Sequence, residues 1–251
     1  MPPLALHTAI AKEVADRLRA PALDDERGGL YLGSTAPDIR VITRWERERT
    51  HFFDLDCFEE QSGITGLFAA YPDLALFSSL SSPTRAFVSG YLTHLVTDET
   101  WITTVYRPHF GQRSPLGGDI RANIMDRALQ FSMDSDHRRD KALMLHVLDA
   151  VSRFDVGLNL ELIDEETLRK WRDVIADIVQ HEPDWERFRQ GAKRHLNLDA
   201  TAENGVDELM RSLPELIDET LRYLTPERVD AFMEDSLRGS VQAVRDYLQC
   251  A

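Results

Sequence analysis

A histidine and an aspartate lie four residues apart in the segment Gly-Tyr-Leu-Thr-His-Leu-Val-Thr-Asp, residues 90–98. On a helix, side chains at positions i and i+4 stack on one face, so His94 and Asp98 can reach a single ion. The surrounding segment is strongly apolar, and a carboxylate buried there needs a cationic partner or a metal. A simple His–Asp hydrogen bond or a pair on the helix surface would have the same spacing, so metal binding requires further ligands.

Two other segments offer such ligands. Asp38 ends an irregular, glycine-rich stretch, and His51 ends an expected helix just before two phenylalanines. Together with His94 and Asp98 they form a mixed nitrogen and oxygen ligand set, which suits zinc, manganese or iron. Taken singly, Asp38 is more typical of a helix N-cap and His51 of a surface histidine. It is the combination that predicts a metal site.

The residues occur in the order His7, Pro37-Asp38, His51-Phe52, Gly90-Tyr91-Leu92-Thr93-His94 and Asp98. This ordered set resembles the zinc-dependent phospholipase C family and, more distantly, the single-strand-specific zinc nucleases. The resemblance covers roughly residues 4–130, and the helix that carries His94 and Asp98 is its most specific part. In that family the matching Asp, His, His and Asp bind one zinc ion. The resemblance therefore implies an all-α fold and a zinc ion held by Asp38, His51, His94 and Asp98.

The chain supplies the other metal ligands of the family only in part. His7 matches a histidine that, in the secreted phospholipases, binds a second ion together with the free N-terminus. A second ion shared between His7 and Asp98 is therefore an alternative to a single ion. A third ion in the family needs a His-x-x-x-Glu helix, but the matching positions here hold Ala122 and Asp126. We expect no three-metal centre, and the family's choline-recognition residues do not transfer either.

A catalytic site of this kind would hydrolyse a phosphate ester with the help of its metal. Asp38, at the loop edge of the site, is the candidate general base as well as a ligand. Arg107 and His109, on the segment after the metal helix, are candidate substrate contacts. The expected substrate is a small phosphorylated molecule, a phosphodiester or a phospholipid headgroup. The alternatives are a non-catalytic metal-binding helical protein that acts through a protein partner, and a helical bundle without metal.

Composition excludes several other classes of protein. The 251 residues include 43 acidic and 29 basic side chains, for a net charge of −14, which argues against a broad nucleic-acid surface. The two cysteines, Cys57 and Cys250, are too few for a disulfide framework or a cysteine zinc site. The N-terminus resembles an amphipathic helix more than a signal peptide, and no apolar run approaches the roughly 20 residues that span a bilayer. We therefore expect a cytoplasmic protein without a transmembrane segment.

The elements that must position these residues are predicted to be helices, because strand patterns are scarce and helical periodicity recurs. We expect one all-α domain of the phospholipase C type over residues 1–251, with a metal-site half at 1–135 and a C-terminal helical half at 136–251. Two stretches, 24–38 and 107–118, are predicted as loops. The expected helices are 4–19, 39–53, a short helix within 62–83, then 84–104, 119–133, 138–154, 165–181, 184–194, 204–223 and 226–249.

Overall fold

The structure, a computed structural model, describes residues 3–55, 57–186 and 213–249. Every regular element in these ranges is helical and none is a strand, which confirms the predicted all-α class. The elements are α1 (Leu4–Leu18), α2 (Pro21–Asp24), α3 (Arg27–Thr35), η1 (Ala36–Ile39), α4 (Arg40–Thr43), α5 (Glu48–His51), α6 (Gly63–Ala70), η2 (Pro72–Ala75), η3 (Phe77–Ser79), α7 (Ser82–Trp101), η4 (Ile102–Phe110), α8 (Ile120–Arg138), α9 (Lys141–Arg153), α10 (Glu165–Gln180), α13 (Leu213–Leu224) and α14 (Pro226–Gln249).

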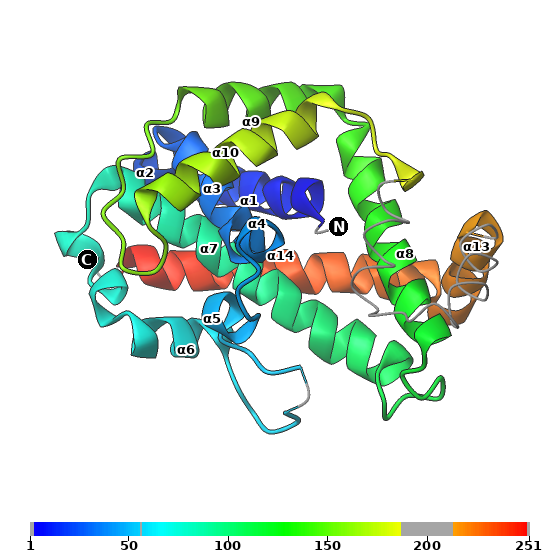
Figure 1. Cartoon of the computed structure of the whole chain (residues 1–251). Helices are drawn as coiled ribbons and strands as arrows, with labels where there is room; N and C mark the ends of the chain where they lie inside the picture. The colour runs from blue at the N-terminus through cyan, green and yellow to red at the C-terminus, as the bar shows by residue number, and fades with distance from the viewer. Residues whose placement is uncertain (1–2, 56, 187–212, 250–251) are drawn as a thin grey trace.

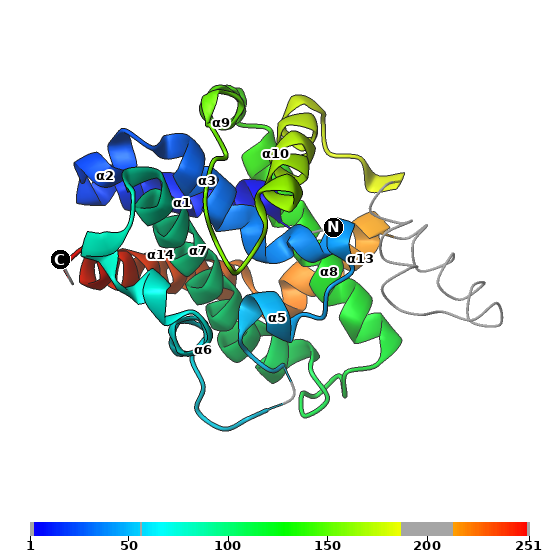
Figure 2. The same cartoon turned by 60° about the vertical axis from the view of Figure 1, so that its left-hand side comes forward.

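Helix α7 is the central element of the fold. It packs against α3 on one side and against α14 on another, while α1 contacts α3, α7, α8 and α14. Figures 1 and 2 show α9 at the top of the molecule, above α1 and α3, with α7 and α14 below them. The hydrophobic core extends from Leu4 to Tyr247, so the helices of both halves of the chain share it. An apolar pattern on more than one face of a helix predicts this central position.

The glycine-rich stretch 24–38, predicted as a loop, is mostly helical, and that prediction was wrong. Within it, α3 lies buried against α7. A Cβ atom on Gly33 would lie 1.9 Å from the carbonyl oxygen of Phe87, and one on Gly90 would lie 2.0 Å from that of Leu30. Glycine normally disfavours a helix, and the glycines of this stretch therefore led to the prediction of a loop. Here glycine lets two helix backbones come into contact, and the space beside Gly90 is filled by α3.

The segment predicted as one helix over 39–53 is divided into short pieces. Arg44 ends α4 and Phe52 ends α5, both in the left-handed backbone conformation that terminates helices. The chain therefore turns at Arg44, between Asp38 and His51, and again directly after His51. These turns allow both side chains to face α7, which one continuous helix of that length would not permit.

The predicted helix 84–104 also differs at its end. Helix α7 stops at Trp101, and the chain continues as the π-helix η4 as far as Phe110. The amide of Ile102 donates to the carbonyl groups of both Asp98 and Glu99, where the wider turn begins. Part of the loop predicted at 107–118 is thus helical. π-Helical turns occur mostly inside longer helices and often at functional sites.

The remaining helices follow their predictions closely where the structure describes them. Helices α8, α9 and α10 each begin at an aspartate whose carboxylate accepts a backbone N–H: Asp119, Asp140 and Asp164. Helix α14 begins at Pro226, as predicted. The predicted helix 184–194 lies largely outside the described residues, whereas the predicted helix 204–223 is described from Leu213 onward and is helical there, as α13. Among the residues that are described, no helix combines the length and apolar character that crossing a membrane requires.

The close contact between α3 and α7 predicts that a larger residue at Gly33 lowers the stability of the protein. Gly33→Ala places a methyl group against the backbone oxygen of Phe87, which no side-chain rotation can relieve. We expect the free energy of unfolding, measured in urea, to fall by about 2 kcal/mol or more. Gly157→Ala is the control, because its added Cβ would meet nothing nearer than 3.8 Å and should change stability by less than about 0.5 kcal/mol. Equal stability of both variants would contradict this packing.

Candidate metal centre

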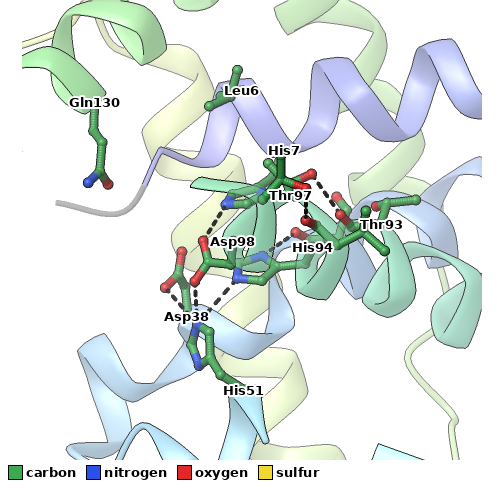
Figure 3. A network of polar contacts seen from close by, with 12 residues as sticks. Leu6, His7, Asp38, His51, Thr93, His94, Thr97, Asp98 and Gln130 are labelled. Atoms are coloured by element: carbon green, nitrogen blue, oxygen red, sulfur yellow. Dashed lines mark hydrogen bonds and ion pairs between the residues drawn. The ribbon is translucent and has the colours of Figure 1, made fainter. Parts of the chain in front are cut away.

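The structure brings together all five residues predicted as metal ligands, from four separate segments (Figure 3). Two overlapping groups share His94, and within each group the ligand atoms lie within 4.8 Å of one another. The first group is Asp38, His51 and His94, and the second is His7, His94 and Asp98. His7 comes from α1, Asp38 from η1, His51 from α5, and His94 with Asp98 from α7.

The distances in this cluster are close to those of a tetrahedral zinc site. His51 Nε2 lies 3.4 Å from His94 Nε2, 3.3 Å from Asp98 Oδ2 and 3.9 Å from Asp38 Oδ1. Zinc binds nitrogen and oxygen at about 2.0–2.1 Å, so neighbouring ligand atoms of a tetrahedron are about 3.3 Å apart. Two of the three separations have this value, and Asp38 would need only a small approach.

Hydrogen bonds on the far side of each imidazole orient the histidines. His94 Nδ1 lies 2.8 Å from the carbonyl oxygen of Ser34, which can only accept, so Nδ1 carries the proton. His51 Nδ1 lies 3.0 Å from the hydroxyl of Thr50, whose own proton is directed to the carbonyl of Arg47 at 3.3 Å. We therefore assign the proton of His51 to Nδ1 as well. Both Nε2 lone pairs then face the same point, an arrangement that favours a cation between them.

His7 extends the cluster toward a second position. Its Nε2 lies 3.8 Å from Asp98 Oδ1, and its ring stacks on that of His94 with centroids 3.8 Å apart. Both ring nitrogens of His7 are buried and have no hydrogen-bond partner among the described residues. A buried polar atom of this kind is costly unless a water or an ion satisfies it. Because Oδ2 of Asp98 faces His51 while Oδ1 faces His7, this carboxylate could bridge two ions.

Helix α1 is held in place just before His7 by an aspartate from a distant helix. Asp134 of α8 is buried and accepts the backbone amides of Ala5 at 2.7 Å and Leu6 at 3.3 Å. The first amides of a helix have no partner within the helix, so this contact satisfies two of them. It also fixes the start of α1, and with it the depth at which His7 enters the cluster.

Sequence reasoning missed Arg47. Its Nη2 lies 2.6 Å from Asp98 Oδ2, and its Nη1 donates to the carbonyl of Phe53 at 2.9 Å. The guanidinium thus orients Asp98 and supplies positive charge beside it, which would partly neutralise the carboxylate in a protein without metal as well. The signal available in the sequence was the position of Arg47, four residues before His51 and directly before the short helix that carries it.

Burial sets the protonation states of the cluster. It lowers the pKa of both His7 and His94 from the ordinary value of 6.5 to about 3, so both rings are neutral near pH 7. Neutral imidazole is the form that binds metals. Burial also raises the pKa of Asp38. In Asp98 burial acts in the same direction, but the positive charge of Arg47, whose Nη2 lies 2.6 Å from Oδ2, holds its pKa well below the usual range.

A pocket of about 160 Å³ opens beside the cluster, and Asp38, His51 and Asp98 form part of its wall. Trp101 is buried and also lines this pocket, where its Nε1 donates to Asp126 Oδ1 at 2.8 Å. Asp126, the acidic position of the incomplete third-ion motif, is thereby held in place. A small molecule in the pocket would contact the ligand cluster directly.

Arg107 is not among the residues that line this pocket, although the sequence made it a candidate substrate contact. Its guanidinium donates to the carbonyl oxygens of Asp54, Leu55 and Cys57. Arg107 therefore fixes the loop that follows His51. A direct contact with substrate stays a prediction without support from this geometry.

His109, the second candidate substrate contact, lies farther along η4 and also does not line the pocket. Its Nε2 is 3.2 Å from a guanidinium nitrogen of Arg228, and its ring meets that of Tyr223 edge-on. These two partners belong to α14 and α13. His109 thus connects η4 to the C-terminal helices.

Comparison with models of known protein families, with curated proteins and with solved structures finds no match for this chain. The buried histidine and aspartate groups could hold a metal ion, and the lone-pair directions and spacing described above fit one.

The lowered pKa values predict how the metal-free protein responds to pH. The unfolded chain protonates His7 near pH 6.5 but the folded protein only near pH 3, so stability is complete above pH 6.5 and falls as the pH decreases toward 3. A His7→Asn variant lacks this contribution. Between pH 6.5 and 5, the unfolding free energy of the wild type should decrease more steeply than that of the variant, by about 1.4 kcal/mol per pH unit. Parallel pH profiles from urea titrations would contradict burial of a neutral His7.

Proposed function

We propose that this chain is a metal-dependent hydrolase of phosphate esters, similar to the zinc-dependent phospholipases C. The supporting observation is the pair of histidine Nε2 atoms 3.4 Å apart, with carboxylate oxygens of Asp38 and Asp98 3.9 and 3.3 Å from His51 Nε2. A set of two imidazoles and two carboxylates, two of whose separations are close to the tetrahedral value, fits zinc best, although manganese and iron accept the same donors. Asp38, His51, His94 and Asp98 would hold the ion, and His7 with Asp98 could share a second.

A zinc ion in such a site supplies a nucleophile near neutral pH and polarises a phosphoryl oxygen. The protein's own part is to place proton acceptors and donors around the reacting group. Asp38 directs Oδ1 toward His51, while its Oδ2 is buried without a hydrogen-bond partner among the described residues. Because Asp38 lines the pocket, its carboxylate would be the group that takes a proton from an attacking water.

The pocket limits the substrate to a small group next to the scissile ester. Its volume of about 160 Å³ is well below the roughly 300–1,000 Å³ of pockets that enclose drug-sized ligands. A phosphate group with a few attached atoms fits this space, and the remainder of a larger substrate would stay outside. We therefore propose a small phosphorylated molecule or an exposed headgroup as the substrate.

Hydrolysis and metal content together test this function. Zinc-loaded wild-type protein should hydrolyse a generic phosphodiester or phosphomonoester such as the p-nitrophenyl phosphates. His94→Ala should lose bound zinc by elemental analysis and lose more than about 100-fold in activity, because removing a ligand costs more than removing its outer partner. Asp38→Asn should also reduce activity strongly. His181→Ala is the control, because that histidine is exposed and does not line the pocket.

Two outcomes would contradict the proposal in different ways. Wild-type protein that purifies and reconstitutes without bound metal would exclude the metal centre itself. Protein that carries zinc but is inert on phosphomonoesters, phosphodiesters and phospholipids would exclude catalysis. That second result would favour a metal-binding helical protein that acts through a protein partner.

A further inference from the structure

Three arginines line the pocket beside the ligand cluster: Arg40 from α4, Arg47 from the turn before α5, and Arg127 from α8. They converge there although the chain as a whole carries a net charge of −14. An overall negative protein repels anions, so a local group of guanidinium ions is needed wherever an anion is to bind. Arginine is also the side chain whose geometry best matches phosphate oxygens.

Two of these arginines have N–H groups that donate no hydrogen bond to any described residue. Arg40 uses Nε to donate to the carbonyl of Trp45 at 3.3 Å, which orients the side chain. Arg127 has Nε 3.8 Å from Asp126 Oδ2, and its side chain is 53% exposed. The terminal amino groups of Arg40 and Arg127 have no hydrogen-bond partner among the described residues. Arg47 differs, since both of its terminal nitrogens are engaged, with Phe53 and Asp98.

The charges of the pocket indicate what kind of anion fits. Its three arginines balance its three carboxylates, which belong to Asp38, Asp98 and Asp126. The divalent ion of the proposed function would then leave two uncompensated positive charges. A phosphodiester carries one negative charge near neutral pH, whereas a phosphomonoester carries nearly two. The charge of the loaded pocket therefore matches a phosphomonoester.

We infer that Arg40 and Arg127 form a subsite for a dianionic phosphate group, and that the substrate is a small phosphomonoester. This inference rests on the proposed function and narrows its substrate class. Hydrolysis would break the bond between phosphorus and the ester oxygen. Water provides the oxygen that bonds to phosphorus, one of its protons leaves with the alcohol, and inorganic phosphate is the other product. The free amino groups of Arg40 and Arg127 would hold the phosphate oxygens throughout.

Phosphate binding tests the subsite independently of turnover. We would titrate the zinc-loaded full chain with inorganic phosphate and with dimethyl phosphate by calorimetry at about pH 8, where inorganic phosphate is mostly a dianion. The wild type should bind phosphate at least tenfold more tightly than dimethyl phosphate. Arg40→Gln and Arg127→Gln should each weaken phosphate binding by about tenfold or more, because each loses hydrogen bonds from a charged donor. Their zinc content should be unchanged.

The matched control is Arg44→Gln, because Arg44 follows α4, is exposed and does not line the pocket. It should bind phosphate as the wild type does. Wild-type affinity in both pocket variants, at full zinc content, would overturn the subsite. Equal affinity of the wild type for phosphate and dimethyl phosphate would overturn its preference for a dianion.

Failure of the proposed function is recognised separately. If the wild type holds no zinc, elemental analysis shows this directly. Phosphate binding to the subsite is then measured on the metal-free chain. A loss of phosphate binding in Arg127→Gln would still support the subsite, and unchanged binding would overturn it.

The phosphate group could belong to a soluble ester or to a lipid headgroup, so two further probes separate these sources. Binding of glycerol 3-phosphate that weakens in Arg40→Gln and Arg127→Gln supports a small soluble ester. Binding to vesicles that contain phosphatidic acid, without binding of glycerol 3-phosphate, would overturn that assignment.

Discussion

Two imidazole lone pairs directed at one point constrain the whole site. His51 Nε2 and His94 Nε2 are 3.4 Å apart, and each ring is oriented by a hydrogen bond at its other nitrogen. Two nitrogen lone pairs at this distance repel each other unless a proton or a cation lies between them. The carboxylates of Asp38 and Asp98 nearby add negative charge, which one proton balances only in part. A divalent ion would neutralise these carboxylates and accept both lone pairs, whereas burying the cluster without a cation is costly in free energy.

The packing of α3 against α7 maintains the orientation of the His94 ring. Gly33 and Gly90 allow α3 and α7 to touch backbone to backbone, and this close crossing brings the carbonyl of Ser34 to 2.8 Å from His94 Nδ1. A larger residue at either glycine would separate the helices and withdraw the acceptor that fixes the ring. The core contact and the ligand geometry are therefore one structural feature. Helix α14 packs on another side of α7 and covers part of this central helix.

The sequence predicted those parts of the structure that depend on local spacing. The i, i+4 relation of His94 and Asp98, the positions of the long helices and the all-helical class all follow from periodicity. The sequence did not predict α3, because the gain that glycine gives at a helix crossing depends on a partner far away in the chain. Arg47 was missed for a similar reason, since its role depends on Asp98, which lies 51 residues away. Arg107 and His109 were placed near the site by sequence proximity, but the π-helical turn after Trp101 directs them to the loop after His51 and to the C-terminal helices.

The location of a metal ion tests the central claim most directly. Anomalous diffraction from crystals of the zinc-loaded protein, recorded on both sides of the zinc absorption edge, would locate the ion without reference to activity. We expect a peak between α5 and α7, about 2.0–2.2 Å from His51 Nε2, His94 Nε2 and one oxygen each of Asp38 and Asp98. Crystals soaked in zinc that show no peak there, with His51 Nε2 donating a proton to Asp98 instead, would contradict the account.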